Sequence, residues 1–295
     1  MRQIGAAARE RLAFSYRISV IICLLTCIPF PVSAGEYSGD PKTPSASAVI
    51  EGGFRQMYNL QFEEAHKTFQ SWEESNPDDP LGPSSNAAAF LYSEFNRLGI
   101  LQSELFASDE NIRRFKKPAP DAAAKEGFEH SLARSERLAD TALARFPQDE
   151  NALFAKVMNQ GLRADYAGLI EKRYLASLGY MKSGRMLALK LLALDPSNYD
   201  AYLAIGVENY VLGSSPAPVR WLLQIFGSQT DKLQGIENVR LTAEKGHYLL
   251  PFARLLLAVA ALRDKDQATA RTLLEGLARD FPDNPLYSRE LGKIK

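Results

Sequence analysis

Four apolar helical runs in this sequence end at a residue–proline step, and this feature constrains the fold more than any other. The four steps are Asn76-Pro77, Phe146-Pro147, Asp195-Pro196 and Phe281-Pro282. Proline fixes its own φ and disfavours the α conformation of the residue before it, so each step ends a helix and opens a turn. The sequence therefore predicts an array of helices joined by short turns.

The stretch 186–213 illustrates one such joint. An apolar run ends at Asp195, and in the next run apolar and aromatic residues recur every three to four positions, as they do along one face of a helix. Ser197 or Asn198 can cap the second helix, because their side-chain oxygens accept hydrogen bonds from its first N–H groups. We expect a helix–turn–helix unit here.

The first 34 residues differ from the rest of the chain. Four arginines precede the apolar run 18–28, and small residues at 32–34 follow two prolines. This order is typical of a secretory signal peptide. It predicts export, to the periplasm in a bacterium, after cleavage near Ala34, and a flexible lead-in over 35–45. An uncleaved anchor ranks second, because the apolar run is shorter than the roughly 20 residues of a membrane helix; lipidation at Cys27 ranks third.

Charge and cysteine content disfavour several classes of function. Both cysteines, Cys23 and Cys27, lie in the leader, so the mature chain would lack thiols for disulfides or metal sites. The leader holds four of the 35 basic and one of the 35 acidic residues, which leaves 31 and 34 and a net charge near −3. Nucleic acid is therefore not expected as a partner. His66, His130 and His247 are far apart in sequence, which predicts structural or surface roles and no metal.

Two helical stretches near the ends of the domain share one frame of small residues and prolines. The shared positions are Gly53, Ala65 and Pro77 in residues 46–79, and Ala258, Ala270 and Pro282 in residues 251–284. In this frame the chain resembles the tetratricopeptide repeat (TPR) family, in which small residues let paired helices approach closely. The resemblance implies an all-α fold over 46–295. It would be a right-handed superhelix, or solenoid, of antiparallel helix pairs that binds a protein or peptide without catalysis.

The repeat pattern is interrupted in several places. Residues 107–127 read as a linker, and residues 214–230 as an insertion, because the second small position of the 186–213 unit would fall at Pro218. The 49 residues between Pro147 and Pro196 exceed one repeat of ~34 residues, which predicts a long second helix over 166–194. Residues 286–294 read as a polar helix that caps the array.

Two groups of residues are candidates for partner contacts. The first combines charges with aromatic rings: Arg163, Tyr166, Arg173 and Tyr174. On one helix, Tyr166, Arg173 and Tyr174 would share a face that either binds a peptide or packs internally as an aromatic stripe. The second group comes from the resemblance, in which the first helix of each pair lines the groove: Asp200, Leu203, Val207 and Tyr210.

The same resemblance argues against one kind of recognition. Some TPR proteins clamp a C-terminal carboxylate with basic and asparagine side chains, but Leu203 and Val207 stand at those positions here. Catalysis is disfavoured as well, because the sequence holds no G-x-S-x-G elbow, phosphate-binding glycine loop or H-E-x-x-H helix. The leading hypothesis is a non-catalytic adaptor or scaffold without a cofactor, whose protein or peptide partner is unidentified.

An apolar segment supports a second hypothesis from a different class. Residues 221–226, with Trp221, Leu222, Ile225 and Phe226, form the most apolar short segment outside the leader. If exposed, they could dock on a membrane surface or a partner, as in a membrane-peripheral envelope-assembly or lipid-associated factor. If they fold back, they fill the interior of the helical array.

Overall fold

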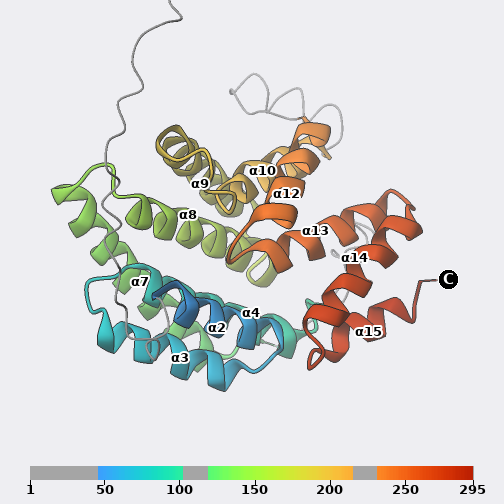
Figure 1. Cartoon of the computed structure of the whole chain (residues 1–295), viewed down its shortest axis with the longest axis horizontal. Helices are drawn as coiled ribbons and strands as arrows, with labels where there is room; N and C mark the ends of the chain where they lie inside the picture. The colour runs from blue at the N-terminus through green and yellow to red at the C-terminus, as the bar shows by residue number, and fades with distance from the viewer. Residues whose placement is uncertain (1–45, 102–118, 215–230, 295) are drawn as a thin grey trace, which may run out of the picture. The chain divides into compact units, whose positions relative to one another are not determined.

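The computed structural model describes residues 46–101, 119–214 and 231–294, all of which belong to one unit, Pro44–Lys295. Within these ranges the regular structure is entirely helical, which confirms the predicted all-α class (Figure 1). The predicted signal peptide lies outside the described residues. Among the helices described, none is long and apolar enough to cross a membrane.

The helices of the described ranges follow one another along the chain. They are α2 (Ala46–Tyr58), α3 (Phe62–Ser75), α4 (Leu81–Leu98), α7 (Ala122–Arg145), α8 (Glu150–Asp165), the π-helix η1 (Tyr166–Ile170), α9 (Tyr174–Leu194), α10 (Tyr202–Gly213), α12 (Lys232–Lys245), α13 (Leu250–Arg263), α14 (Gln267–Asp280) and α15 (Pro285–Leu291). Each α-helix packs against the next described α-helix in sequence (Figure 1).

Four helices end at the residue–proline steps, as the sequence predicts. The residues before proline are Asn76, Phe146, Asp195 and Phe281, and all four have φ between −133° and −128° and ψ between 66° and 94°. Their backbone N–H groups still donate to the carbonyl four residues earlier, at 2.8 or 2.9 Å. Proline thus permits the last helical hydrogen bond and then diverts the chain.

Acidic and asparagine side chains begin most of the later helices. The capping residues are Asp121, Asp149, Asp231, Asp266 and Asn284, each of which accepts a hydrogen bond from a first-turn N–H. The prediction that Ser197 or Asn198 caps the following helix is wrong. That helix, α10, begins only after Ala201, and the Ser197 hydroxyl donates instead to Asp195 at 2.6 Å.

Two other boundaries differ from the sequence prediction. α7 begins at Ala122, inside the stretch 107–127 that reads as a linker, because Asp121 supplies a cap. The run 166–194 is not a single helix: η1 is followed by a break at which Lys172 has a φ of 58°. This break, rather than one extended helix, takes up part of the extra length between Pro147 and Pro196.

A glycine-to-glycine crossing joins α10 to α12. A Cβ on Gly206 would lie 2.8 Å from the Val239 nitrogen and 2.9 Å from the Gly235 carbonyl oxygen, so only glycine lets the two backbones come this close. The second small residue of this unit would have fallen at position 218, where a proline stands. Gly235 takes that place 17 residues later, and 17 residues is also the length of the predicted insertion 214–230. The insertion therefore separates, in sequence, two helices that pack together.

The same packing arrangement recurs in the first helix pair. A Cβ on Gly53 of α2 would strike the ring of Phe69 of α3, just as one on Gly206 would strike Val239. Phe69 follows the small residue Ala65 by four positions, and Val239 follows Gly235 by four. Both pairs thus share one arrangement. A small residue on the first helix is covered by a side chain of the second helix, and that side chain lies one turn after the second helix's own small residue.

The first and last helix pairs are in contact with each other. The Asn284 amide donates to the Tyr58 carbonyl at 2.8 Å, and Arg55 donates to the Asp280 carbonyl at 3.2 Å, over sequence separations of 226 and 225 residues. The rings of Tyr58 and Phe281 lie 5.6 Å apart. In an open solenoid each repeat contacts only its neighbours, so these contacts are additional to the sequential packing.

The last helix contributes to this contact. α15 was expected to be a polar cap, yet Leu286 and Tyr287 are 8% and 5% exposed, and Tyr287 belongs to the same buried cluster as Tyr58. α15 packs against α14, and its capping residue Asn284 donates to the Tyr58 carbonyl at the end of α2. One side of the helix is therefore buried near the contact between the two ends of the unit, while Ser288 and Arg289 face solvent.

Candidate binding site

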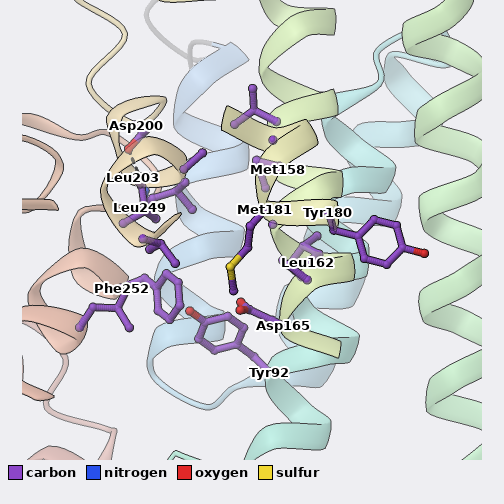
Figure 2. Close-up of a pocket in the computed structure, with 18 of the residues that line it drawn as sticks. Tyr92, Met158, Leu162, Asp165, Tyr180, Met181, Asp200, Leu203, Leu249 and Phe252 are labelled. Carbon is purple, nitrogen blue, oxygen red and sulfur yellow. Dashed lines mark hydrogen bonds between the residues drawn. The ribbon is translucent and has the colours of Figure 1, made fainter. Parts of the chain in front are cut away.

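A cavity of about 130 Å³ lies among residues from the first, middle and last parts of the unit. Its wall is contributed by α2, α4, α8, α9, α10 and α13 and by the turn before α10, so it depends on the contact between the ends of the chain. Most of the lining is aliphatic, aromatic or methionine, including Phe54, Met57, Tyr92, Met158, Met181 and Phe252 (Figure 2).

Two buried tyrosines form part of the wall. The Tyr58 hydroxyl donates to the Tyr248 carbonyl at 3.1 Å. Tyr92 packs edge-on against Tyr58 and Phe252, with ring centroids 5.8 and 5.7 Å away. The Tyr92 hydroxyl lies near that of Tyr58, but the geometry makes no hydrogen bond and leaves it without a partner. Burial raises the pKa of both phenols well above their ordinary value, so both stay neutral.

Asp165 places a carboxyl group in this apolar wall. It is the last residue of α8, and its side chain points towards the Tyr92 ring and the Met181 thioether (Figure 2). The carboxyl lies deep in the unit but remains partly accessible from the cavity. Burial raises its pKa from 3.8 to about 7, and no cation among the described residues opposes that shift. The group is therefore close to half ionised at neutral pH.

The π-helical turn after α8 orients these side chains. Tyr166 turns towards α7, where its ring stacks on Phe128 at a centroid distance of 4.9 Å. The Ser177 hydroxyl of α9 donates to the Ala164 carbonyl at 2.8 Å, which ties the start of α9 to the end of α8. A π-turn adds a residue to the helical register and is frequent at functional sites. Here the π-turn directly follows Asp165 and begins with Tyr166, whose ring packs against α7.

Asp200 lies at the opposite end of the cavity, and its carboxylate has a structural task. Its oxygens accept hydrogen bonds from the N–H groups of His247, Tyr248 and Leu249, at 2.9 to 3.1 Å. Burial raises the pKa of this carboxyl, while the three N–H groups act to lower it. The side chain thus fixes the turn before α13 against the start of α10. Of the two carboxyls in the wall, Asp165 alone has no such partners.

α10 and the turn before it contribute to the cavity wall. Asp200, Leu203 and Val207 line the cavity, whereas Tyr210 does not. Leu203 is 6% exposed and packs against α12 and α13, and Val207 is half-buried. The Tyr210 ring lies instead 5.7 Å from the Lys232 ammonium. Their role as partner contacts stays a prediction.

The other predicted group does not form one face. Tyr166 is buried, but Tyr174 is 51% exposed and begins a new helix beyond the break. Arg173 forms an ion pair with Glu171 at 3.0 Å, and Arg163 is half-buried near the end of α8. The shared face fails because η1 and the break shift the helical register between residues 166 and 174. The predicted aromatic packing applies only to Tyr166.

The described residues that line the central cavity include neither the predicted docking segment nor the histidines. The segment with Trp221, Leu222, Ile225 and Phe226 is outside the described residues. His66 is hydrogen-bonded to Asn86 at 2.5 Å and His247 pairs with Glu51 at 2.5 Å. No cluster of three metal-ligating side chains occurs in the ranges that the structure describes.

A second hollow, between α12, α13 and α14, is larger but has a different character. Its volume is about 530 Å³, and charged side chains share its lining with aliphatic ones. Two of these charges already have partners, since Arg254 pairs with Asp280 at 2.9 Å and Asp264 with Lys232 at 2.6 Å. The central cavity is the stronger candidate because its wall is mostly apolar, and two of its polar groups, the Tyr92 hydroxyl and the Asp165 carboxyl, have no partner among the described residues.

The sequence analysis did not identify three members of the cavity wall: Tyr92, Asp165 and Phe252. Asp165 follows Met158 and Leu162 at helical spacing, so the period of α8 places it on their face, but a charged residue was not expected in an apolar wall. Tyr92 and Phe252 meet across 160 positions of sequence. A helical period assigns each of them to an inner face but cannot pair them.

Comparisons with protein-family models, with curated proteins and with solved structures give no match for this chain. The function therefore has to be inferred from the chain's own residues and from the arrangement of its helices.

Proposed function

We propose that the chain is a TPR-like helical repeat protein, with its helix pairs in a right-handed superhelix and an irregular insertion over 214–230. Two observations support this. Four helices end at residue–proline steps with the same backbone geometry. The small-residue crossing of α2 and α3 also recurs in α10 and α12. The contacts between the first and last pairs fit a superhelix that curves until its ends meet.

The proposed function is that of a non-catalytic adaptor in the cell envelope that holds a protein or peptide partner by one apolar anchor. The size and composition of the central cavity carry this proposal. At about 130 Å³ it is smaller than the roughly 300–1,000 Å³ of drug-sized ligand sites. It is close to the dry apolar cavity of about 150 Å³ that holds benzene. The space suits one side chain, and buried anchors of this kind dominate many interfaces.

The cavity is also reachable from its rim. Gly161, which contributes to the lining, is exposed, and Met181, Val207 and Leu256 beside the cavity are half-buried. A partner side chain can enter between these residues while its backbone stays outside. The basic leader before residue 35 is the reason to place this adaptor in the envelope after export.

The test is to obstruct the cavity without disturbing the fold. A Cβ at Gly161 would meet nothing within 4 Å, so Gly161→Leu adds an apolar side chain at the rim with room for its first carbon. Gly179 on α9 has equal space and does not line the cavity, so Gly179→Leu is the matched control. Partners cross-linked to the full chain in an envelope fraction are identified by mass spectrometry.

We expect the unmodified protein and Gly179→Leu to capture the same partner in equal amounts. The amount captured by Gly161→Leu should fall by at least about tenfold, because a hot-spot anchor is worth 2 kcal/mol or more. Thermal melts verify that both variants fold. If Gly161→Leu captures every partner as well as the control does, the cavity does not hold the anchor and the proposal is wrong.

A further inference from the structure

The polar groups in the wall of the central cavity indicate what kind of group it could bind. Its wall is apolar except at a few points, and one of these is a hydroxyl without a hydrogen-bonding partner, that of Tyr92. Tyr92 is 7% exposed, and a buried hydroxyl that lacks a partner costs free energy in the native state. The hydroxyl oxygen is covered by its neighbours, so the Tyr92 side chain has to turn slightly before a polar group of an occupant can supply the missing partner.

The second polar group is the Asp165 carboxyl, which lies next to Tyr92 (Figure 2). No ion pair with a described residue compensates its charge, although carboxylates in apolar surroundings are normally paired. An occupant that brings its own positive charge would supply the missing partner. A neutral occupant would leave the ionised form of Asp165 as poorly solvated as before.

Aromatic rings surround the same space. Phe54, Tyr58, Tyr92 and Phe252 all line the cavity. Ring faces attract cations, and the attraction grows where water is excluded. The Tyr180 ring, by contrast, extends away from the other labelled lining residues (Figure 2). Carboxyl, hydroxyl and rings thus lie together at one apolar site.

We propose that the cavity binds a primary alkylammonium group: the apolar stem lies against Met158, Met181 and Phe252, the cation pairs with Asp165, and an N–H donates to the Tyr92 hydroxyl. This inference rests on the proposed function and names the chemistry of the anchor. A butylammonium chain is about the size of benzene, which a cavity of similar volume can hold. The same group occurs on a lysine side chain and on a free amine.

Binding of this kind depends on pH in a defined direction. The titratable groups in the wall are Tyr58 of α2, Tyr92 of α4, Asp165 of α8, Tyr180 of α9 and Asp200 before α10, while α13 contributes apolar side chains only. Asp200 is held by three N–H groups, and Tyr58 and Tyr92 stay neutral. With the Asp165 pKa at about 7, we expect binding to be about tenfold tighter at pH 8 than at pH 6.

The test uses methionine methyl groups as reporters in the full chain. Three of the five methionines, Met57, Met158 and Met181, line the cavity, and Met186 on α9 is 57% exposed and outside it. In protein labelled with ¹³C at the methionine methyls, n-butylammonium is titrated at pH 6 and pH 8, and n-butanol serves as a neutral probe of equal stem length. We expect the cavity signals to shift and that of Met186 to stay.

Two conservative variants separate charge from shape. Asp165→Asn keeps the side-chain volume and should weaken butylammonium binding at pH 8 by at least about tenfold, with the pH dependence lost. Tyr92→Phe removes only the hydroxyl and should weaken it by roughly threefold to tenfold. Butanol binding should change little in Asp165→Asn. Melting curves show whether each variant is folded.

Three outcomes decide the inference. Tighter binding of butylammonium at pH 8 that requires Asp165 supports it; competition by acetyl-Gly-Lys-Gly-amide then identifies a lysine side chain as the source, and its absence a free amine. If butanol binds as tightly as butylammonium and Asp165→Asn changes neither, the ammonium inference is overturned while an apolar anchor stands. If neither probe shifts the cavity signals, the ammonium inference and the proposed apolar anchor both fail.

Discussion

Ionisation of Asp165 is unfavourable in the folded protein. Its pKa of about 7 in the folded state stands above the ordinary 3.8, because burial disfavours the charged form. A raised carboxyl pKa contributes stability at low pH, and that contribution is lost as the pH rises through the folded-state value. Residues that bind ligands often carry such a cost, and here it lies at the proposed ammonium site.

Asp165→Asn should therefore change how stability depends on pH. Between pH 5 and pH 8 the ionisation of Asp165 should lower the free energy of unfolding by about 2–3 kcal/mol. Because asparagine cannot ionise, the loss of stability between pH 5 and pH 8 should be smaller in the variant than in the unmodified protein by this amount. Urea unfolding at the two pH values measures it. Asp78→Asn, at an exposed turn residue, is the control, and equal pH slopes for Asp165→Asn and the unmodified protein would contradict the prediction.

Single residues also mark the limit of what the sequence could predict. Gly53 and Ala65 were expected at close helix packing from the family resemblance; a Cβ on Gly53 would strike the second helix of the pair, and Ala65 is fully buried. Asp165 was not assigned any role from the sequence. Its burial depends on the packing of α8 against helices from both ends of the chain, which no local pattern encodes.

At the scale of elements, helix ends were more predictable than helix partners. The steps before proline set four C-termini through a local steric effect, so they could be read directly. The pairing of α10 with α12 was not predicted, because the second glycine of the crossing lies beyond 214–230. The π-turn was also missed, because its one glycine, Gly168, does not by itself distinguish a π-turn from a regular helical run.

The α10–α12 crossing gives a prediction at this scale. Gly206→Leu should destabilise the protein by about 1–3 kcal/mol, near the upper end, because its Cβ would press on the backbone atoms of Val239 and Gly235, which cannot move aside as a side-chain tip can. Gly179→Leu, with no atom within 4 Å of the added Cβ, should change stability little. Urea denaturation of both variants measures the difference. Equal midpoints would mean that the two helices do not cross here.

For the whole unit, the contact between first and last pairs distinguishes this chain from a simple linear array. In a linear array, stability is a sum of terms between neighbours, and a change at one end is felt locally. Here the central cavity draws its wall from α2 and α13 together, so the site exists only while the ends meet. The sequence predicted the repeated elements but not this closure, because contacts over more than 220 positions leave no periodic trace.

Asn284→Asp tests the closure directly. The Asn284 side chain has two roles: its oxygen accepts from the Leu286 N–H and caps α15, and its amide donates to the Tyr58 carbonyl. Aspartate caps a helix equally well but cannot donate, and it sets a carboxylate against a buried carbonyl. The variant should lose about 1–3 kcal/mol, and hydrogen exchange should accelerate at α15 and also at the Leu60 and Gln61 amides after α2. Acceleration confined to α15 would show that the two ends are independent.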